Sequence, residues 1–345
     1  MTDSYWREDS GTEFPAAPLP TTHCAEHLTL LVVIVCYRAA ELTVSCLRSL
    51  EGQINDVPGT LVAVCENGSG PDALHRLRSA VIQEGWSDWV LLVPSSVNGG
   101  FAAGNNLILR QAMVWPEPPD YFLLLNPDTI VHPGALRALH EAMEANPQIG
   151  IAGPRILSAA GQVQNSCFRD PSPASEFLRA AGTGALNRLF GRSDFELAPP
   201  RGATVYDWTS FACAIIRADV LRQVGLLDEG YFLYFEDPDY CRRARSLGWQ
   251  IGHCPSATIT HLEGGSNSVP SDTRARRRRP QYYYASRARY FAKFLGRAGL
   301  WAANLAWFAG RAIALAREAA RTKRPHHCSR EGSDLWKNWR KPVEL

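Results

Sequence analysis

The sequence predicts an α/β fold in which helices flank an open, mostly parallel sheet. Short apolar runs recur about every 30 residues in the first half of the chain, which is the length of a strand–helix–strand unit. Uninterrupted Val, Ile and Leu suit parallel strands that are buried on both faces. The predicted strands are Leu28–Cys36, Thr60–Cys65, Trp89–Val93, Tyr121–Leu125 and Ile149–Ala152.

Helical segments lie between these runs and justify the alternating architecture. Proline, a residue favoured in a first helical turn, opens two of them. The predicted helices are Glu41–Leu50, Pro71–Ile82, Gly104–Met113 and Pro133–Ala145.

The second half of the chain is less regular. Between Arg155 and Tyr206 we expect loops and one helix near Ser175–Leu189. Asp207–Arg217 reads as a strand and Ala218–Val224 as a helix, and the segment Pro280–Arg321 is helical and rich in aromatic residues and arginine. We therefore predict a disordered tail over residues 1–26, a main domain over 27–270 and a basic, aromatic helical extension over 271–345.

Composition excludes several classes of protein. The net charge of +2 on 345 residues gives no bulk attraction to nucleic acid. Several of the nine cysteines sit in apolar runs, which indicates small buried side chains in a reducing compartment. We find no signal-peptide pattern and no run of 18 uncharged apolar residues, so we expect a cytoplasmic protein.

Polar or glycine residues follow four predicted strands, at the edge where open α/β sheets bind ligands. A single such loop is explained by ordinary turn chemistry, but four in register indicate a binding site. These residues include Tyr37, Arg38, Glu66, Asn98, Gly100, Asn126 and Asp128.

The tripeptide Asn126-Pro127-Asp128 is the sharpest of these strand ends. A carboxylate there can hold Mg²⁺ or Mn²⁺, and the ion can bridge two phosphates. The alternative is that Asp128 shapes a turn or caps the next helix. His261 ends a short apolar run and is a candidate second ligand if Asp128 marks a metal site.

In the segment Gly225–Arg242, five carboxylates flank a group of four aromatic residues between Gly230 and Glu236. Acids against aromatic walls are partly desolvated, which raises their pKa and suits a base that accepts a proton from a hydroxyl. The alternative is helix capping by Asp237 or Asp239. The five acids are Asp228, Glu229, Glu236, Asp237 and Asp239.

With these motifs in order, the chain resembles the family 2 glycosyltransferases, especially their bacterial rhamnosyltransferase-like branch, from Leu28 to Ser266. The segments that carry the resemblance are Val32–Tyr37, Glu66–Ser69, Asn98–Asn106, Leu123–Asp128, Trp208–Arg217, Gly225–Arg242 and Thr260-His261 with Gly265-Ser266.

The resemblance implies a GT-A fold and an inverting, metal-dependent transfer of a sugar, with rhamnose the favoured sugar, from a dTDP- or UDP-sugar. Asp128 and His261 would bind Mg²⁺ or Mn²⁺, Asp237 would be the catalytic base, and Glu66 would hold the nucleoside. The implied donor-binding residues are Tyr37, Arg38, Glu66, Asn98, Gly100, Phe101, Asn105, Asn126 and Asp128. The implied acceptor-binding residues are Trp208, Glu236 and Asp239.

The resemblance also implies an acceptor hydroxyl on a glycan or a lipid-linked sugar, used in bacterial surface polysaccharide synthesis, and no nucleic-acid partner. Two other functions compete. A nucleotidyltransferase would need a basic, glycine-rich loop after the first strand, where the chain has Tyr37-Arg38-Ala39-Ala40. An inactive scaffold of a polysaccharide-assembly complex is favoured by Asn126 and Phe211, where the family often has an acid and a glycine.

The C-terminal segment supports two interpretations. Aromatic residues from Tyr282 to Phe308 alternate with basic ones, a composition that suits a helix lying in a membrane interface on the inner face of the bacterial membrane. The same residues could instead pack on the main domain. The run Arg274–Arg279, with five arginines, is either a solvated loop or a contact with an anionic surface.

Overall fold

The computed structural model describes residues 27–184, 186, 206–262, 269–322 and 324–344. The predicted tail over residues 1–26 and the Gly265-Ser266 part of the closing motif lie outside the described residues.

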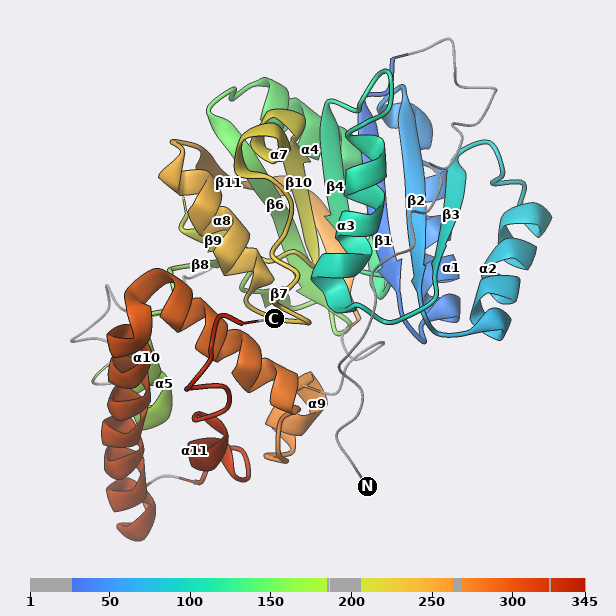
Figure 1. The fold of residues 1–345 in the computed structure, drawn as a ribbon. Helices are drawn as coiled ribbons and strands as arrows, with labels where there is room; N and C mark the ends of the chain where they lie inside the picture. The colour runs from blue at the N-terminus through green and yellow to red at the C-terminus, as the bar shows by residue number, and fades with distance from the viewer. Residues whose placement is uncertain (1–26, 185, 187–205, 263–268, 323, 345) are drawn as a thin grey trace.

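A single large sheet forms the centre of the main domain (Figure 1). Its first four strands pair in parallel in the order β3-β2-β1-β4, as the alternating pattern predicts. They are β1 (Leu30–Cys36), β2 (Thr60–Asn67), β3 (Val90–Ser95) and β4 (Tyr121–Leu125).

The sheet continues past β4 with an antiparallel strand, β10, which separates β4 from β6. A parallel neighbour, β11, follows β6, and short strands complete the edges. The remaining strands of the large sheet are β5 (Thr129–Val131), β6 (Ile149–Ser158), β7 (Val163–Gln164), β10 (Cys213–Arg217) and β11 (Gln250–His261). A separate two-stranded antiparallel sheet pairs β8 (Cys167–Phe168) with β9 (Trp208–Thr209).

Two apolar layers explain why the central strands are uninterrupted. Alternate residues of β1 enter different layers: Val32 and Ile34 pack on one face, Val33 and Val35 on the other. Helices α1 (Ala40–Glu51), α2 (Pro71–Gln83) and α4 (Ala135–Glu144) supply the first layer, whereas α3 (Gly100–Ala112), α7 (Ala218–Val224) and α8 (Glu236–Ser246) supply the second. Burial on both faces is what the predicted parallel strands require.

Some boundaries differ from those expected. Helix α3 begins at Gly100 instead of Gly104, so the glycine-rich segment forms its first turn. The expected strand Asp207–Arg217 is divided into β9 and β10 by a turn. Strand β11 is 12 residues long, although only its end, Ala257–Thr260, stands out in the sequence.

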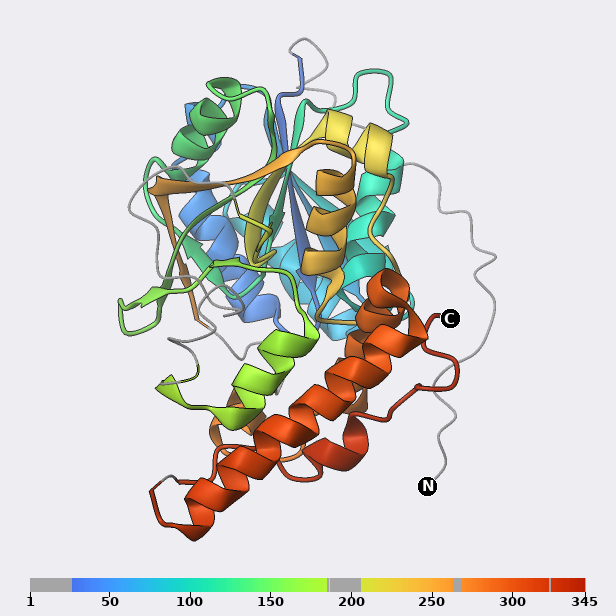
Figure 2. The same cartoon turned by 90° about the vertical axis from the view of Figure 1, so that its left-hand side faces the viewer.

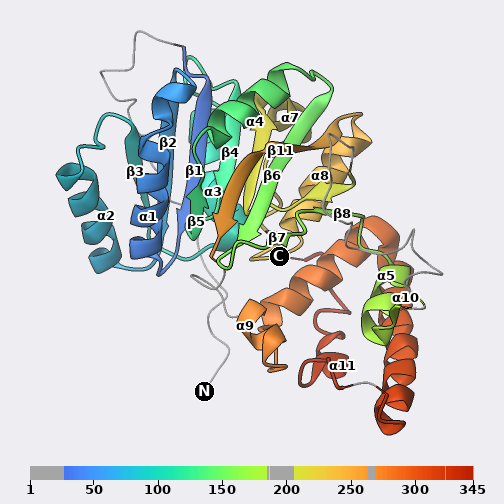
Figure 3. The ribbon, with the colours of Figure 1, turned by 180° about the vertical axis from the view of Figure 1, so that it is seen from behind.

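The C-terminal extension lies beyond the sheet edge and is built around one long helix (Figures 1 and 3). This helix, α10 (Gln281–Ala319), is kinked at Gly296 and packs against α5 (Pro173–Ala181). The short helices α9 (Val269–Arg274) and α11 (Glu331–Asp334) complete the layer.

Part of the arginine run forms ion pairs within this layer. Arg277 pairs with Asp272, Arg278 with Asp334 and Arg279 with Glu331. Three of the five arginines thus have carboxylate partners inside the protein, while four of the five stay exposed, so both interpretations of the run stay predictions.

Some aromatic residues of α10 are buried in the protein and others are exposed to solvent. Tyr290, Phe291 and Trp307 are buried, whereas Trp301 is 42% exposed and Phe308 is 39% exposed. No helix in the described part of the chain is both long and apolar enough to cross a bilayer.

Candidate active site

A cleft opens at the carboxyl edge of the parallel strands, where the sequence places its polar motifs. In the sheet register, Cys36 pairs with Glu66 and Ile34 with Leu125, so the following residues leave the sheet side by side. The cleft has a volume of about 300 Å³. Five predicted donor-binding residues line it: Tyr37, Asn98, Gly100, Phe101 and Asn126.

Asn67, which the sequence prediction did not select, organises one wall of this cleft. Its amide nitrogen donates to Asn98 Oδ1 and to the carbonyl oxygen of Gly100, both at 3.1 Å, and its Oδ1 accepts from the backbone N–H of Gly99 at 3.3 Å. These bonds fix the start of α3. The signal was present in the sequence, because Asn67 directly follows Glu66 at the strand end.

The other predicted donor residues occupy different positions. Glu66 is 3% exposed and accepts the Ser69 N–H at 2.7 Å, so in this structure it shapes the loop after β2. Arg38 is exposed and lines a neighbouring hollow. Asn105 is buried on α3 and donates to the carbonyl oxygen of Phe101 at 2.8 Å.

Gly100 allows the loop before α8 to close over the cleft. Its φ of +83° is favourable only for glycine, and a Cβ there would collide with the carbonyl oxygen of Phe232 and lie 2.7 Å from Phe232 Cδ2. The backbone N–H of Phe101 donates to the same carbonyl at 2.8 Å. Phe232 and Leu233 from this loop therefore complete the cleft wall, together with Tyr282 from the first turn of α10.

The predicted metal ligands meet at the end of β4. His261 Nε2 lies 3.3 Å from Asp128 Oδ1 and 3.4 Å from Asn126 Nδ2. Two atoms that share an octahedral ion at about 2.1 Å lie roughly 3 Å apart, so the carboxylate and imidazole suit one divalent cation. The Asp128 side chain is 4% exposed and the His261 side chain 20%. This pair is the set that could hold Mg²⁺ or Mn²⁺.

Three acids stand in the first turn of α8: Glu236, Asp237 and Asp239. The two residues before the helix, Tyr234 and Phe235, both have φ of +71°, an unusual backbone that sets the direction of this turn. Burial raises the pKa of Asp237 to about 7. Burial, and then the charge of Asp237, raise the pKa of Glu236 well above its usual value.

The segment Phe211-Ala212 lies between Asp237 and the strand end that carries Asn126. The backbone of Phe211 favours the charged form of the Asp237 carboxyl, an effect on its pKa that is smaller than that of burial. The next residue, Ala212, accepts the N–H of Asn126 through its carbonyl oxygen at 2.9 Å. An acid that accepts protons near neutral pH is thus held beside the strand end that carries Asn126 and Asp128.

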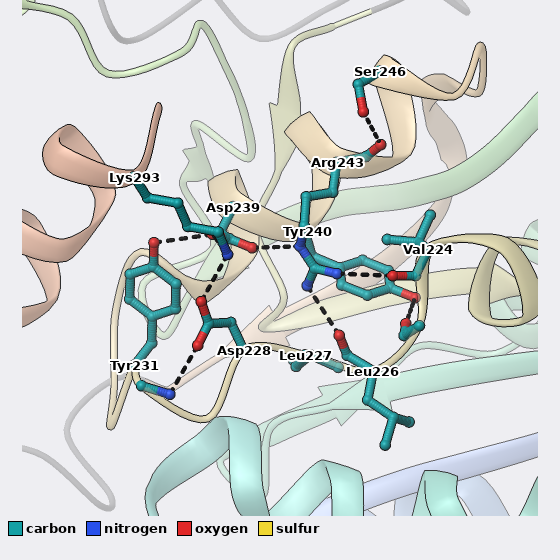
Figure 4. A network of polar contacts seen from close by, with 12 residues as sticks. Val224, Leu226, Leu227, Asp228, Tyr231, Asp239, Tyr240, Arg243, Ser246 and Lys293 are labelled. Carbon is teal, nitrogen blue, oxygen red and sulfur yellow. Dashed lines mark hydrogen bonds and ion pairs between the residues drawn. The ribbon is translucent and has the colours of Figure 1, made fainter. Parts of the chain in front are cut away.

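Asp239 sits in a buried charge network between α8, the preceding loop and α10 (Figure 4). Its Oδ1 accepts from Arg243 Nε at 2.7 Å, and its Oδ2 accepts from the Tyr231 hydroxyl at 3.0 Å and from Lys293 Nζ at 2.6 Å. Lys293 also bonds Asp228 at 2.7 Å. Both oxygens of this fully buried side chain are engaged in holding elements together.

Trp208 is likewise engaged in packing. Its indole N–H donates to the carbonyl oxygen of Arg169 at 2.8 Å, and its ring stacks on Phe168 at 4.2 Å. Phe211, a residue that could narrow the acceptor side, is 2% exposed and packs on Tyr240. Neither Trp208 nor Asp239 lines the cleft, and their binding of an acceptor stays a prediction.

The same edge of the sheet thus holds a carboxylate–imidazole pair and an acid with a raised pKa. Transfer of a sugar from a diphosphate to a hydroxyl requires groups of these kinds, so we assign the protein to the class of glycosyltransferases. The family model described as "Glycosyltransferase like family 2" matches residues 27–283. This match spans more than half of the chain, so the chain belongs to glycosyltransferase family 2.

Similar curated proteins include rhamnosyltransferases. The N-acetylglucosaminyl-diphospho-decaprenol L-rhamnosyltransferase of Mycobacterium tuberculosis is 28% identical over an alignment of 240 residues. The alignment covers 66% of this chain and 74% of the relative. The rhamnosyltransferase WbbL of Escherichia coli is 24% identical over 170 residues, 49% of this chain and 62% of WbbL.

Solved structures share the fold at low identity. The mannosyltransferase PcManGT from Pyrobaculum calidifontis, in complex with GDP-Man and Mn²⁺, superposes with a TM-score of 0.51 at 16% identity, over 96% of this chain and 87% of that chain. GalNAc-T7 with UDP, GalNAc and Mn²⁺ gives a TM-score of 0.52 at 14% identity, over 91% of this chain and 55% of that longer chain. Both likenesses confirm the GT-A-like fold.

Proposed function

We propose that this chain is an inverting, metal-dependent hexosyltransferase. It transfers a sugar from a dTDP- or UDP-sugar to a hydroxyl of a glycan or lipid-linked acceptor. The observation that supports the proposal is the position of Asp237 beside Phe211, whose neighbour Ala212 accepts the N–H of Asn126, because the proposed base would then lie close to the proposed metal ligands.

The donor would occupy the cleft between β1, α3 and the loop before α8. Tyr37 and Phe101 offer aromatic surfaces to a nucleoside, and Asn98 and Asn126 offer amide groups to its polar atoms. Asp128 and His261 would hold Mg²⁺ or Mn²⁺. When bound, the cation offsets the negative charge that develops on the departing diphosphate.

Asp237 would remove the proton from the acceptor hydroxyl as its oxygen attacks the anomeric carbon. The new C–O bond forms as the bond from that carbon to the diphosphate oxygen breaks, and the bonding electrons leave with the diphosphate. Attack from the face opposite the leaving group inverts the anomeric configuration without a covalent enzyme intermediate. A pKa of about 7 makes Asp237 a stronger base than an ordinary carboxylate.

Rhamnose is the proposed sugar because two similar proteins are named rhamnosyltransferases. One of these names also includes a diphospho-decaprenol acceptor, which supports a lipid-linked acceptor for this chain. These properties suit surface polysaccharide synthesis at the inner face of a bacterial membrane.

A donor screen tests the proposal. The melting temperature of the purified protein is measured in the presence of one donor at a time, with and without Mn²⁺. The donors are dTDP-rhamnose, UDP-glucose, UDP-N-acetylglucosamine and GDP-mannose. We expect dTDP-rhamnose with Mn²⁺ to raise the melting temperature most, because a ligand that binds the native state stabilises it. If calorimetry finds binding of neither a nucleotide sugar nor Mn²⁺, the inactive scaffold replaces the enzyme.

A further inference from the structure

Helix α10 has an apolar face that its neighbours in the described chain cover only in part. Trp301 packs on Trp336 and Trp339, and Phe308 packs on Trp336, yet both rings stay more than a third exposed. From residue 298 to residue 316, every residue classed as exposed is Ala, Leu, Phe or Trp. The large members are Trp301 (42% exposed), Leu305 (58%), Phe308 (39%) and Leu315 (51%). Their spacing of four, three and seven residues places them along one side of the helix.

The opposite side of the helix is already used for packing. Trp307 and Asn304 are buried, and Asn304 bonds Arg287 at 2.7 Å and the Leu335 carbonyl at 3.2 Å. A Cβ on Gly310 would collide with the carbonyl oxygen of Phe177 on α5, so the two helices touch closely there. Figure 2 shows the outward side of α10 running along the surface of the extension. The exposed part of the apolar face is therefore not used for packing within the described chain.

The surrounding charge is strongly one-sided. Among the described residues from 295 to 344, seven exposed side chains are cationic and one, Glu344, is anionic. The other acids of this stretch are half-buried or buried, and they have cationic partners: Glu318 pairs with Arg311, Glu331 with Arg279 and Asp334 with Arg278. The seven are Arg297, Arg321, Arg324, Arg330, Lys337, Arg340 and Lys341.

We propose that the face formed by Trp301, Leu305, Phe308 and Leu315, here called the α10 apolar face, lies in the surface of an anionic lipid bilayer. The face is roughly 21 Å long at 1.5 Å per residue, and no helix described here is suited to crossing the bilayer. A helix with an apolar side and basic surroundings rests in the headgroup region with its axis along the membrane.

Charge selects lipid over a second copy of the chain. Two copies would bring their exposed cations together, and Glu344, the one exposed acid among the described residues 295–344, already pairs with Lys341, so charge opposes association. The positions flanking the large residues include Ala302, Ala309 and Ala316, which offer no charged group to specify a partner helix. Anionic headgroups attract the same cations.

Vesicle sedimentation tests this surface without any sugar transfer, so its result is independent of the proposed function. Full-length protein is mixed with vesicles of phosphatidylcholine alone or with 40% phosphatidylglycerol (roughly the anionic content of a bacterial membrane). We expect sedimentation with the anionic vesicles that weakens as salt increases. Leu305→Glu/Phe308→Glu should lower the bound fraction about tenfold.

The control variant is Ile82→Glu/Val114→Glu, which adds the same two negative charges on exposed apolar side chains of the main domain. It should sediment like the unchanged protein, and both variants should keep the native melting temperature and donor-binding affinity. The proposal is overturned if the unchanged protein stays in the supernatant, or if the double variant sediments normally. A concentration-dependent dimer that the double variant abolishes would overturn it in favour of self-association.

Discussion

His261 Nε2 lies 3.3 Å from Asp128 Oδ1, although the two residues belong to distant parts of the chain. The pairing of β11 with β5 produces this meeting, because His261 is opposite Thr129 in the antiparallel register. The N–H of Leu262 also donates to the carbonyl oxygen of Asp128 at 2.9 Å. The backbone of His261 and Leu262 is therefore fixed against the backbone of Asp128 and Thr129. This arrangement would hold the imidazole in place for the proposed ion before the ion binds.

Replacing His261 or Asp128 by alanine should abolish the Mn²⁺-dependent part of donor binding. Each variant removes one ligand of the proposed ion, and we expect at least a tenfold loss of metal affinity. Calorimetric titration of Mn²⁺ in the presence of a nucleoside diphosphate measures it. His327→Ala is the matched control, because Glu318, His326 and His327 form a separate cluster that could bind metal nonspecifically. Equal Mn²⁺ affinity in His261→Ala and the unchanged protein would contradict the site.

Asp237→Asn should lower the turnover number by about 10²–10⁴-fold while donor affinity stays nearly constant. The amide keeps the shape of the carboxylate but cannot accept the acceptor proton. Asp219→Asn is the control, since Asp219 is an exposed acid on α7. Turnover by radiolabelled transfer and donor affinity by calorimetry separate the two effects. Wild-type turnover in Asp237→Asn would disprove the base assignment.

The pH profile of kcat/KM should rise through about pH 7, because Asp237 must be deprotonated to act as a base. The stability effect has the opposite direction. Burial raises the pKa of Asp237 above its unfolded value, so its contribution to stability is full below pH 4 and is lost as pH rises through about 7. Urea unfolding at pH 5 and pH 8 should show Asp237→Asn gaining stability relative to wild type at the higher pH.

Gly100→Ala should weaken donor binding and destabilise the fold by about 1–3 kcal/mol. The substitution forces a side chain into a positive φ and into the Phe232 carbonyl oxygen. Gly134→Ala is a matched control, because Gly134 has a φ of +79° but open space around the added Cβ. Both variants carry backbone strain, so only Gly100→Ala should raise the donor dissociation constant. An equal donor affinity in the two variants would show that closure of this loop is not required.

Lys293→Met should destabilise the protein by about 3 kcal/mol, because it leaves the buried Asp239 without one of its cationic partners. Lys293→Arg keeps the charge and should recover part of this loss. Lys337→Met removes an exposed lysine and should change the free energy of unfolding by less than about 0.5 kcal/mol. Urea unfolding compares the three. A loss as small as that of Lys337→Met would mean that the network contributes little to stability.

The position of the cleft follows from the ends of the predicted strands, whereas the acceptor side stays a prediction. Tyr37, Asn98, Gly100, Phe101 and Asn126 come after predicted strands, and all five line the cleft. Strand ends are visible locally, since the apolar run stops and polar residues begin. The acids of α8 were also visible as a group, but their separate roles were not.

Whether an acid of α8 contacts a cation or a backbone group depends on distant residues. Asp237 and Asp239 are two positions apart in the same helical turn, yet Asp239 meets Lys293 from α10, whereas Asp237 meets the backbone of Phe211. Tyr282 enters the cleft wall only because α10 begins beside it. No local pattern encodes these partners.

By itself the sequence determined the parallel half of the sheet, the polar strand ends and a helical, basic extension, because hydrophobic periodicity and turn chemistry act over a few residues. The tertiary structure alone decided that His261 reaches Asp128, that Gly100 admits Phe232, and that α10 buries one side and exposes the other. These relations depend on strand order and helix packing, which place side chains from distant segments within a few ångströms of one another.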